Sequence, residues 1–175
     1  VTEHTHGKTA YYKRQWKTMG VGIKTKVEYK PDETRFTQRC TQEALAFIRK
    51  QTDTPFFLYL AQPQVHKEVL RSKEFEGRTK RGRYGDSCEE LDWSMGEILK
   101  ALKAQGIDKD TLVVYFSDNG PWLNQGDQSG TAKPLRGGKF TTWEGGMRVP
   151  CIMRWPGQIP AGGVCDKIAS VMDLF

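Results

Sequence analysis

Two side chains with oxygen donors follow the apolar run LVVYFS, within the sequence SDNG. Asp118 and Asn119 supply a carboxylate and an amide, which are ligands that suit a hard cation such as Ca²⁺ or Mg²⁺. Asn followed by Gly is also a common turn sequence, and taken alone the dipeptide favours a turn. Because calcium takes about 6–8 oxygens, a metal site here would need further carboxylates from elsewhere.

A lysine lies in the glycine-rich stretch PLRGGKFTTWEGGMRVP, residues 134–150, which holds four glycines. Glycine lets the backbone approach a ligand closely. In such a loop the ammonium of Lys139 could hold an oxyanion as a point charge, and the alternative is a solvated loop lysine. Arg148 either ties this loop down through carbonyl groups or is exposed. The stretch therefore combines glycine-rich backbone with positive charge shortly after Asp118.

A histidine follows a second apolar run, PFFLYLA, in the sequence AQPQVH. An imidazole with an ordinary pKa near 6.5 can give or take a proton at neutral pH. His66 is therefore a candidate proton donor, and the alternative is a polar surface residue. Trp122, Trp143 and Trp155 are interpreted as packing residues rather than as platforms for a substrate.

Two amphipathic helices are predicted from the spacing of apolar residues. The first covers residues 32–51, where the apolar positions are Phe36, Cys40, Ala44, Phe47 and Ile48. The second covers about residues 84–105, and its stripe consists of Tyr84, Cys88, Leu91, Met95, Ile98, Leu99 and Leu102. Carboxylates at its start and lysines at its end suit the helix dipole, the carboxylates being Asp86, Glu89 and Glu90. Gly106 is a natural stop for this helix.

Three strands are predicted, over residues 55–61, 112–117 and 151–155. The first is uninterrupted and apolar, which is typical of a strand buried on both faces. A strand, a helix and a second strand at this spacing indicate a parallel βαβ unit with a right-handed crossover, so the fold class is α/β. Residues 168–175 are read as the start of a further helix.

The predicted parallel sheet brings the candidate residues to one place. In open parallel sheets, ligands bind beyond the carboxyl ends of the strands. His66 follows one predicted strand and Asp118 and Asn119 follow another. We therefore expect these side chains to emerge at the same edge of the sheet.

Composition limits the choice of partners. The chain has 175 residues, a net charge of +6 and a pI near 9.1, which is compatible with anionic partners. The densest basic patch, RTKRGR at residues 78–83, has no accompanying nucleic-acid motif and is interpreted as a solvated loop. No apolar run approaches the ~20 residues that span a bilayer. We expect no nucleic-acid partner and no membrane span.

Metal binding through cysteine or the first histidines is disfavoured. The cysteines lack the paired spacing of a zinc site, and two of them, Cys40 and Cys88, are interpreted as small buried thiols on helix faces. His4 and His6 could form a metal tract, but a loop-like segment is the favoured interpretation.

Several segments together resemble one family in order and spacing. They are PFFLYLAQPQVH, YGDSCEELDWSMGEILKAL, TLVVYFSDNG, LRGGKFTTWEGGMRVP, RWPGQIPAG and MDLF. The series is similar to the sulfatase family, arylsulfatase-like enzymes within the alkaline phosphatase superfamily. It covers about residues 33–175, and residues 1–32 form a variable lead-in segment. SDNG followed by GGKxTTxEGGxRxP is the specific part of this resemblance.

The resemblance implies a three-layer α/β/α fold with a mostly parallel sheet, and hydrolysis of sulfate esters with one divalent cation, Ca²⁺ or else Mg²⁺. By position, Asp118 and Asn119 match metal ligands of the family, and Lys139 matches the lysine that contacts the sulfate oxygens. His66 matches the histidine beside the leaving-group oxygen, although the family's His-Thr-Pro reads His-Lys-Glu here. The implied substrate is a sulfated small molecule or glycan.

The nucleophile of the family is a formylglycine made from Cys or Ser in the signature C/S-x-P/A-x-R. No cysteine or serine of this sequence has that context. We therefore expect residues 33–175 to be an incomplete part of a catalytic domain, inactive alone, rather than a short protein that has lost catalysis. The alternatives left open are a phosphatase or phosphodiesterase of the same superfamily, and a non-catalytic anion-binding module. Family members are commonly secreted, periplasmic or lysosomal, and the sequence indicates neither a compartment nor an oligomeric state.

Overall fold

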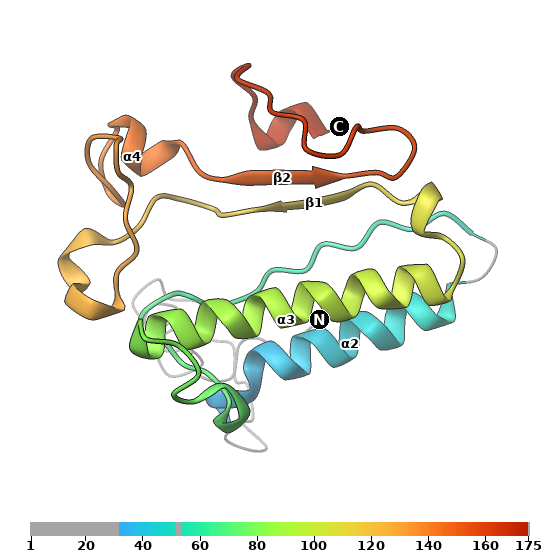
Figure 1. The fold of residues 1–175 in the computed structure, drawn as a ribbon, viewed down its shortest axis with the longest axis horizontal. Helices are drawn as coiled ribbons and strands as arrows, with labels where there is room; N and C mark the ends of the chain where they lie inside the picture. Colours follow the sequence, from blue (N-terminus) through green and yellow to red (C-terminus); the bar gives the residue numbers. More distant parts are fainter. Residues whose placement is uncertain (1–31, 52–53, 175) are drawn as a thin grey trace, which may run out of the picture. The chain divides into compact units, whose positions relative to one another are not determined.

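The computed structural model describes residues 32–51 and 54–174 (Figure 1). The histidines of the N-terminal tract, His4 and His6, lie outside this range. Two compact units divide the chain. Of the described residues, the first unit comprises 32–44 and 58–94, and the second comprises 45–51, 54–57 and 95–174.

The first predicted helix is confirmed. A 3₁₀ turn, η2 (Glu33–Arg35), leads into α2 (Phe36–Lys50). The side chain of Asp32 caps the turn by accepting a hydrogen bond from Thr34 N at 3.1 Å, which satisfies one of the amide groups left free at a helix start. Along α2 the predicted apolar positions turn inward, and the buried ones are Cys40, Ala44 and Ile48.

The second predicted helix is also confirmed, as α3 (Gly82–Ala104). Gly106 adopts a φ of 74°, and the amides of Gly106 and Ile107 donate back to Lys103 O and Leu102 O, so Gly106 ends the helix as predicted. The expected role of the carboxylates is wrong, because the first turn contains no acidic residue. Asp86 instead accepts hydrogen bonds from Gly77 N and Thr79 N at 2.9 and 2.8 Å.

The interior of the first unit includes a polar seam, which we define as Gln38, Thr41, Gln62, Ser72, Asp86, Ser87, Glu90 and Ser94. Most of these side chains are buried, and hydrogen bonds link several of them to one another. Thr41 Oγ1 donates to Ser94 Oγ at 2.6 Å, and Gln38 Nε2 donates to Ser72 Oγ at 3.0 Å. Apolar contacts such as Phe75 against Trp93, with ring centroids 5.7 Å apart, pack beside the seam.

Two of the three predicted strands are confirmed, and they pair with each other, a pairing that was not predicted. β1 (Val113–Phe116) and β2 (Cys151–Arg154) form a two-stranded antiparallel ribbon. The register pairs Val113 with Arg154 and Phe116 with Cys151. Arg154 also forms a bidentate ion pair with Asp108 at 2.7 and 2.9 Å, which ties β2 to the turn that follows α3.

The third predicted strand, residues 55–61, belongs to no strand in the structure. Its side chains alternate between half-buried and exposed, and Phe57 and Tyr59 are 73% and 75% exposed. The expectation of burial on both faces is therefore wrong for these residues. An apolar run indicates that burial of its side chains is favourable, but it does not identify the segment that would cover them. The parallel three-layer arrangement stays a prediction.

Short helical turns form most of the remaining connections. They are η3 (Lys73–Phe75), η4 (Asp108–Asp110), η5 (Leu123–Gln128), α4 (Glu144–Met147) and η6 (Val171–Leu174). The helix expected near the end of the sequence is therefore only a 3₁₀ turn. Among the described residues no helix is both long and apolar enough to cross a membrane.

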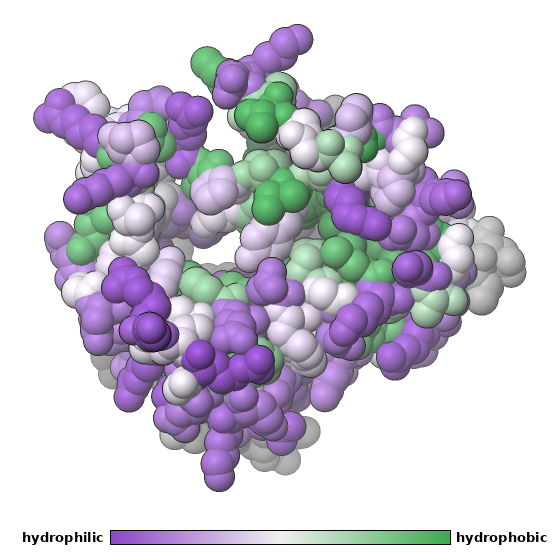
Figure 2. Space-filling view, viewed as in Figure 1, coloured by the Kyte–Doolittle hydropathy of each residue, from purple (hydrophilic) through white to green (hydrophobic). Residues whose placement is uncertain are grey.

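Apolar side chains reach the surface of the second unit (Figure 2). On the ribbon, Tyr115, Ile152 and Met153 are exposed, and near the end of the chain so are Ile168 and Met172.

Candidate functional site

The turn that follows β1 carries Asp118 and Asn119. The backbone bends at Asp118 and Asn119, and Ser117 Oγ donates a hydrogen bond to Asn119 O at 3.0 Å across this bend. Asp118 is exposed, Asn119 is half-buried and Gly120 is buried. The turn interpretation is therefore correct for the backbone, and it leaves the carboxylate of Asp118 accessible to a ligand.

Glycines lock this turn onto the stretch that carries Lys139. Gly120 N donates to Gly146 O at 2.9 Å, and Lys139 N donates to Pro121 O at 2.9 Å. A Cβ on Gly120 would lie 1.8 Å from Gly145 O, so only glycine allows this approach. We call the two backbones held in this way, residues 118–121 and 136–146, the glycine interlock.

The glycine-rich half of the interlock is also folded tightly on itself. Gly145 N donates to Arg136 O at 2.8 Å, and a Cβ on Gly145 would lie 2.3 Å from Gly137 O. Gly138 O accepts from both the amide and the hydroxyl of Thr141. The glycines were expected to let backbone approach a ligand. In the structure they let backbone approach backbone, and this fixes the attachment point of Lys139 relative to Asp118.

The ammonium of Lys139 lies near two aromatic rings. Its Nζ is 5.9 Å from the ring centroid of Trp122 and 5.6 Å from that of Phe140. The rings meet edge to face, with centroids 5.3 Å apart and an interplanar angle of 89°. Within the part of the chain that the structure describes, this ammonium forms no ion pair and no hydrogen bond.

A second cation stacks on an aromatic ring in the same stretch. The guanidinium carbon of Arg136 lies 3.7 Å from the ring centroid of Trp143, which is close enough for a cation–π interaction. Arg148 is exposed and lies 3.8 Å from a carboxylate oxygen of Glu144, so the exposed alternative for Arg148 is the correct one. Trp155 donates its indole N–H to Lys109 O at 2.8 Å, as a packing residue.

His66 belongs to the first unit, whereas the other three predicted site residues belong to the second. Its ring is exposed, and Nδ1 lies 2.6 Å from Lys67 O. Because a carbonyl oxygen only accepts, Nδ1 carries the proton of this hydrogen bond. Nε2 is then the ring atom that can exchange a proton with another group.

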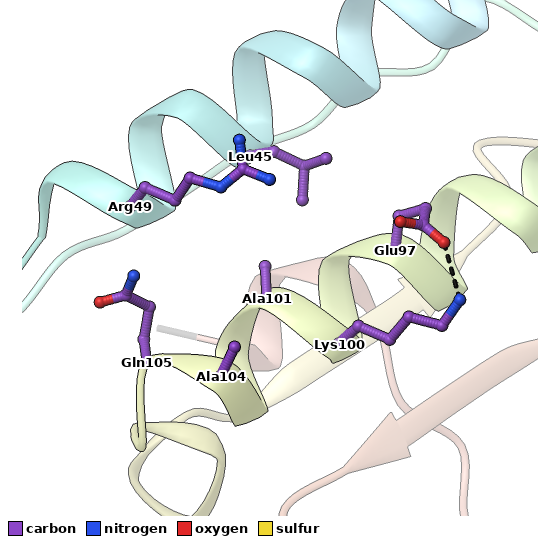
Figure 3. Close-up of a pocket in the computed structure, with 7 residues that line it drawn as sticks. All are labelled: Leu45, Arg49, Glu97, Lys100, Ala101, Ala104 and Gln105. Carbon is purple, nitrogen blue, oxygen red and sulfur yellow. Dashed lines mark hydrogen bonds and ion pairs between the residues drawn. The ribbon is translucent and has the colours of Figure 1, made fainter.

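A hollow of ≈ 190 Å³ lies between the ends of α2 and α3 in the second unit (Figure 3). Its lining residues are Leu45, Arg49, Glu97, Lys100, Ala101, Ala104 and Gln105. Lys100 Nζ donates to Glu97 Oε1 at 2.8 Å, so one cation at its rim is already paired. The hollow includes none of the predicted site residues.

The cysteines of α2 and α3 lack the lowered pKa of a reactive thiol. Burial raises the pKa of the Cys40 and Cys88 thiols above their usual value, which keeps both protonated at neutral pH. Cys40 is buried, as predicted, and Cys88 is half-buried. Among residues 32–51 and 54–174 no three His, Cys, Asp or Glu side chains gather as a metal site.

The structure therefore brings Asp118, Asn119 and Lys139 onto two hydrogen-bonded segments. The convergence of His66 with them stays a prediction. The residues around Lys139 that sequence reasoning missed are Trp122, interpreted as packing only, and Phe140. Both lie within four positions of a residue already singled out, in NGPW and GKF, and this proximity was the available signal.

Comparisons with known proteins place the chain in a family. The sulfatase family model matches residues 3–175, and the chain belongs to the sulfatase family. It is 45% identical over 166 residues to N-acetylgalactosamine-6-sulfatase of Mus musculus, an alignment that covers 93% of this chain and 32% of that protein. It is 44% identical over 144 residues to steryl-sulfatase of Homo sapiens, covering 79% of this chain and 25% of that protein.

Solved structures give the same result. The PsFucS1 sulfatase from Pseudoalteromonas sp. superposes with a TM-score of 0.72 at 30% identity, over 92% of this chain and 36% of that chain. A protein solved in complex with neocarrahexaose, Ps i-CgsB, superposes with a TM-score of 0.67 at 30% identity, over 87% of this chain and 37% of that chain. The chain thus has the fold of part of a sulfatase, and it spans about a third of the length of the curated sulfatase from mouse.

Proposed function

We propose that this chain forms part of an enzyme that hydrolyses sulfate esters, and that the glycine interlock carries its anion-binding residue. The observation that supports this is the state of Lys139. Its backbone is hydrogen-bonded to the segment of Asp118, while its ammonium is paired with no described carboxylate. An unpaired cation at a fixed position suits a ligand that brings its own negative charge.

Sulfate ester cleavage requires stabilisation of negative charge, which the ammonium of Lys139 could provide. Negative charge on the sulfuryl oxygens and on the leaving oxygen must be stabilised as the S–O bond breaks. A preorganised positive charge achieves this without reorganising at the moment of reaction, and such electrostatic stabilisation is usually the largest single contribution to catalysis. In this proposal Lys139 holds the sulfuryl oxygens.

We propose Asp118 and Asn119 as ligands of a divalent cation. Asp118 and Asn119 both carry oxygen donors of the kind that Ca²⁺ and Mg²⁺ prefer, and the exposed carboxylate of Asp118 forms no ion pair or hydrogen bond with another described side chain. The two residues would hold such a cation with additional ligands from elsewhere. Bound there, the cation would act as a Lewis acid toward the sulfuryl oxygens.

His66 is the proposed proton donor to the leaving oxygen. With Nδ1 engaged by Lys67 O, the imidazolium form would present Nε2–H outward, and loss of that proton would leave a neutral ring with the same hydrogen bond. The nucleophile, a formylglycine by family resemblance, would come from outside these residues, since no matching signature is present. In the whole domain we also expect residues 55–61 to join a mostly parallel sheet between helical layers.

The substrate class is proposed from the relatives. The names of similar proteins refer to a sulfated N-acetylgalactosamine and to sterol sulfates, and one similar structure holds an oligosaccharide. We propose a sulfated sugar or another small sulfate ester for this protein as well.

The test replaces Lys139 by Ala in the full-length protein and measures hydrolysis of 4-nitrophenyl sulfate. We expect kcat/KM to fall by ~10²-fold or more. The matched control is Lys133→Ala, which removes an exposed lysine from the same region and should leave the rate unchanged. Equal rates for the two variants would remove Lys139 from the site. Faster cleavage of 4-nitrophenyl phosphate than of the sulfate would favour the phosphatase alternative, and no cleavage of either ester would favour an anion-binding module.

A further inference from the structure

We propose that Trp122 and Phe140 are positioning residues that hold the Lys139 ammonium in place without neutralising it. This inference rests on the proposed function of Lys139 as an anion-binding group. It adds a pair of aromatic side chains through which the lysine would act.

Two cation–ring contacts at one ammonium carry the inference. The Nζ atom lies 5.9 and 5.6 Å from the two ring centroids, both within the roughly 6 Å range in which a ring attracts a cation. The rings are themselves packed edge to face at 5.3 Å, so each fixes the orientation of the other. The two rings therefore give the long, flexible side chain of Lys139 a preferred direction.

The backbone supports the same geometry. Lys139 N donates to Pro121 O, the residue directly before Trp122, so the lysine and the first ring start from hydrogen-bonded segments. Phe140 has a φ of 72° and is the one described residue other than glycine with positive φ. A bulky residue in this region of φ is strained, and such strain is commonly found where a side chain must be held in a particular direction.

Aromatic rings suit this task better than a carboxylate would. An Asp or Glu beside Lys139 would fix the ammonium, but it would also cancel the charge that the sulfuryl group needs and would repel that group directly. A ring attracts the cation through its quadrupole and carries no net charge. The nearest acidic residue along this stretch, Glu144, instead lies beside Arg148.

The first experiment tests the geometry alone. Protons on the carbon next to the Lys139 nitrogen should be shifted upfield by the ring currents of Trp122 and Phe140 in NMR spectra of the full-length protein. The shift should shrink in Trp122→Leu and in Phe140→Leu and should be largely kept in Trp122→Phe, which restores a ring. Trp155→Leu removes an aromatic ring of the same unit that follows the opposite end of the ribbon, where Val113 pairs with Arg154, and should not change it. Random-coil positions for these protons in the unmodified protein would overturn the proposal.

The second experiment tests the consequence. With 4-nitrophenyl sulfate as substrate, loss of either ring should lower kcat/KM by about two- to fivefold, the effect expected of one exposed cation–π contact. Trp122→Phe should recover most of the rate. Phe140→Gly removes the ring and the backbone strain together, and because glycine tolerates positive φ it keeps the test valid if Phe140→Leu unfolds.

The outcomes separate this inference from the proposed function. A large loss of rate in Lys139→Ala with unchanged rates in both ring variants would overturn the positioning role and leave the proposed function standing. An unchanged rate in Lys139→Ala would overturn the function of the lysine itself. Loss of rate in Lys139→Ala and in both ring variants, with rescue by Trp122→Phe, would support both.

Discussion

The polar seam of the first unit and the glycine interlock of the second fix a loop in opposite ways. In the seam, buried side chains hold backbone amides, as when Glu90 Oε2 accepts from Ser72 N at 2.8 Å. In the interlock, the hydrogen bonds between the two segments join backbone to backbone, and the glycines leave no room for a side chain at the closest approach. Side chains anchored by backbone can therefore remain exposed, as Asp118 does.

The charged groups of the two regions also differ in their role. The carboxylates of the seam have perturbed pKa values for structural reasons. Burial alone would raise the pKa of Asp86, but the hydrogen bonds from Gly77 N and Thr79 N hold it below the usual value. A perturbed pKa is often a pointer to a functional site. Here it marks the residues that hold the fold.

Of the two regions, the glycine interlock should lose more unfolding free energy when a single residue is substituted. Gly120→Ala would place a methyl group 1.8 Å from Gly145 O, and overpacking of this kind costs about 1–3 kcal/mol or more in unfolding free energy. Chemical denaturation measures the loss. Hydrogen exchange should also show lost protection at the amides of Gly120 and Lys139, which donate across the interlock.

Gly96→Ala is the matched control for this prediction. Gly96 lies within α3, and a Cβ there would meet nothing within 4 Å. Replacing a helical glycine by alanine should stabilise the protein by about 0.5–1 kcal/mol. If both substitutions had the same effect, the interlock would not depend on the absence of a side chain.

The seam is expected to respond to pH. Glu90 is 0% exposed, and its Oε1 atom is buried with no hydrogen-bond partner. Burial raises the pKa of this carboxyl above its usual value. Its contribution to stability is therefore fully present below the unfolded pKa of about 4.3 and is lost as pH rises through the folded pKa.

Glu90→Gln should consequently stabilise the protein at pH 7 and flatten this dependence. The neighbouring charges are Glu74, which raises the pKa further, and Asp86 one helical turn away, with Arg71 Nε at 3.9 Å from it. Thermal unfolding from pH 4 to pH 7.5 measures the difference, which should vanish near pH 4. A variant that is less stable at pH 7 would mean that the charged carboxylate is favoured in the folded state.

The smallest change in stability is expected on substitution within the bidentate pair of Asp108 and Arg154. The hydrogen bond from Arg154 lowers the pKa of Asp108, so the pair stabilises the fold above the unfolded pKa of about 3.9 and loses this effect as pH falls through the lowered value. Asp108→Asn should reduce the unfolding temperature slightly at pH 7, with the gap closing in acid. An equal gap at pH 2.5 and pH 7 would contradict the role of charge.

Periodicity was enough to predict α2 and α3, and apolar runs were enough to predict β1 and β2, whereas the helix expected at residues 168–175 is a 3₁₀ turn. The apolar spacing that ends at Gly106 is a local property, and the helix ends where this glycine takes a positive φ. The pairing of β1 with β2 is not local, and nothing in either run distinguishes a parallel from an antiparallel partner. Residues 55–61 show the same limit, because apolar character measures the tendency to be buried and not the identity of the neighbour.

The sequence singled out the candidate residues, whose roles stay predictions, but not the way in which the backbone holds them together. SDNG and GGK indicated Asp118, Asn119 and Lys139 directly. The glycines were expected to allow contact with a ligand. A glycine in the sequence shows that something approaches the backbone closely, but not whether this is a ligand or another part of the backbone. Trp122 and Phe140 were not assigned to Lys139, since cation–ring contacts depend on geometry and have no fixed spacing along the chain.

The register of the ribbon has a consequence for engineering this protein. β1 and β2 run in opposite directions, with Phe116 opposite Cys151. This register determines which residues meet beyond the end of the ribbon. Slippage by two residues would carry one strand about 6–7 Å along the other and separate Gly120 from Gly146. Substitutions at mid-ribbon positions such as Val114 or Met153 could thus displace the Lys139 segment from the Asp118 turn in a protein that still unfolds cooperatively.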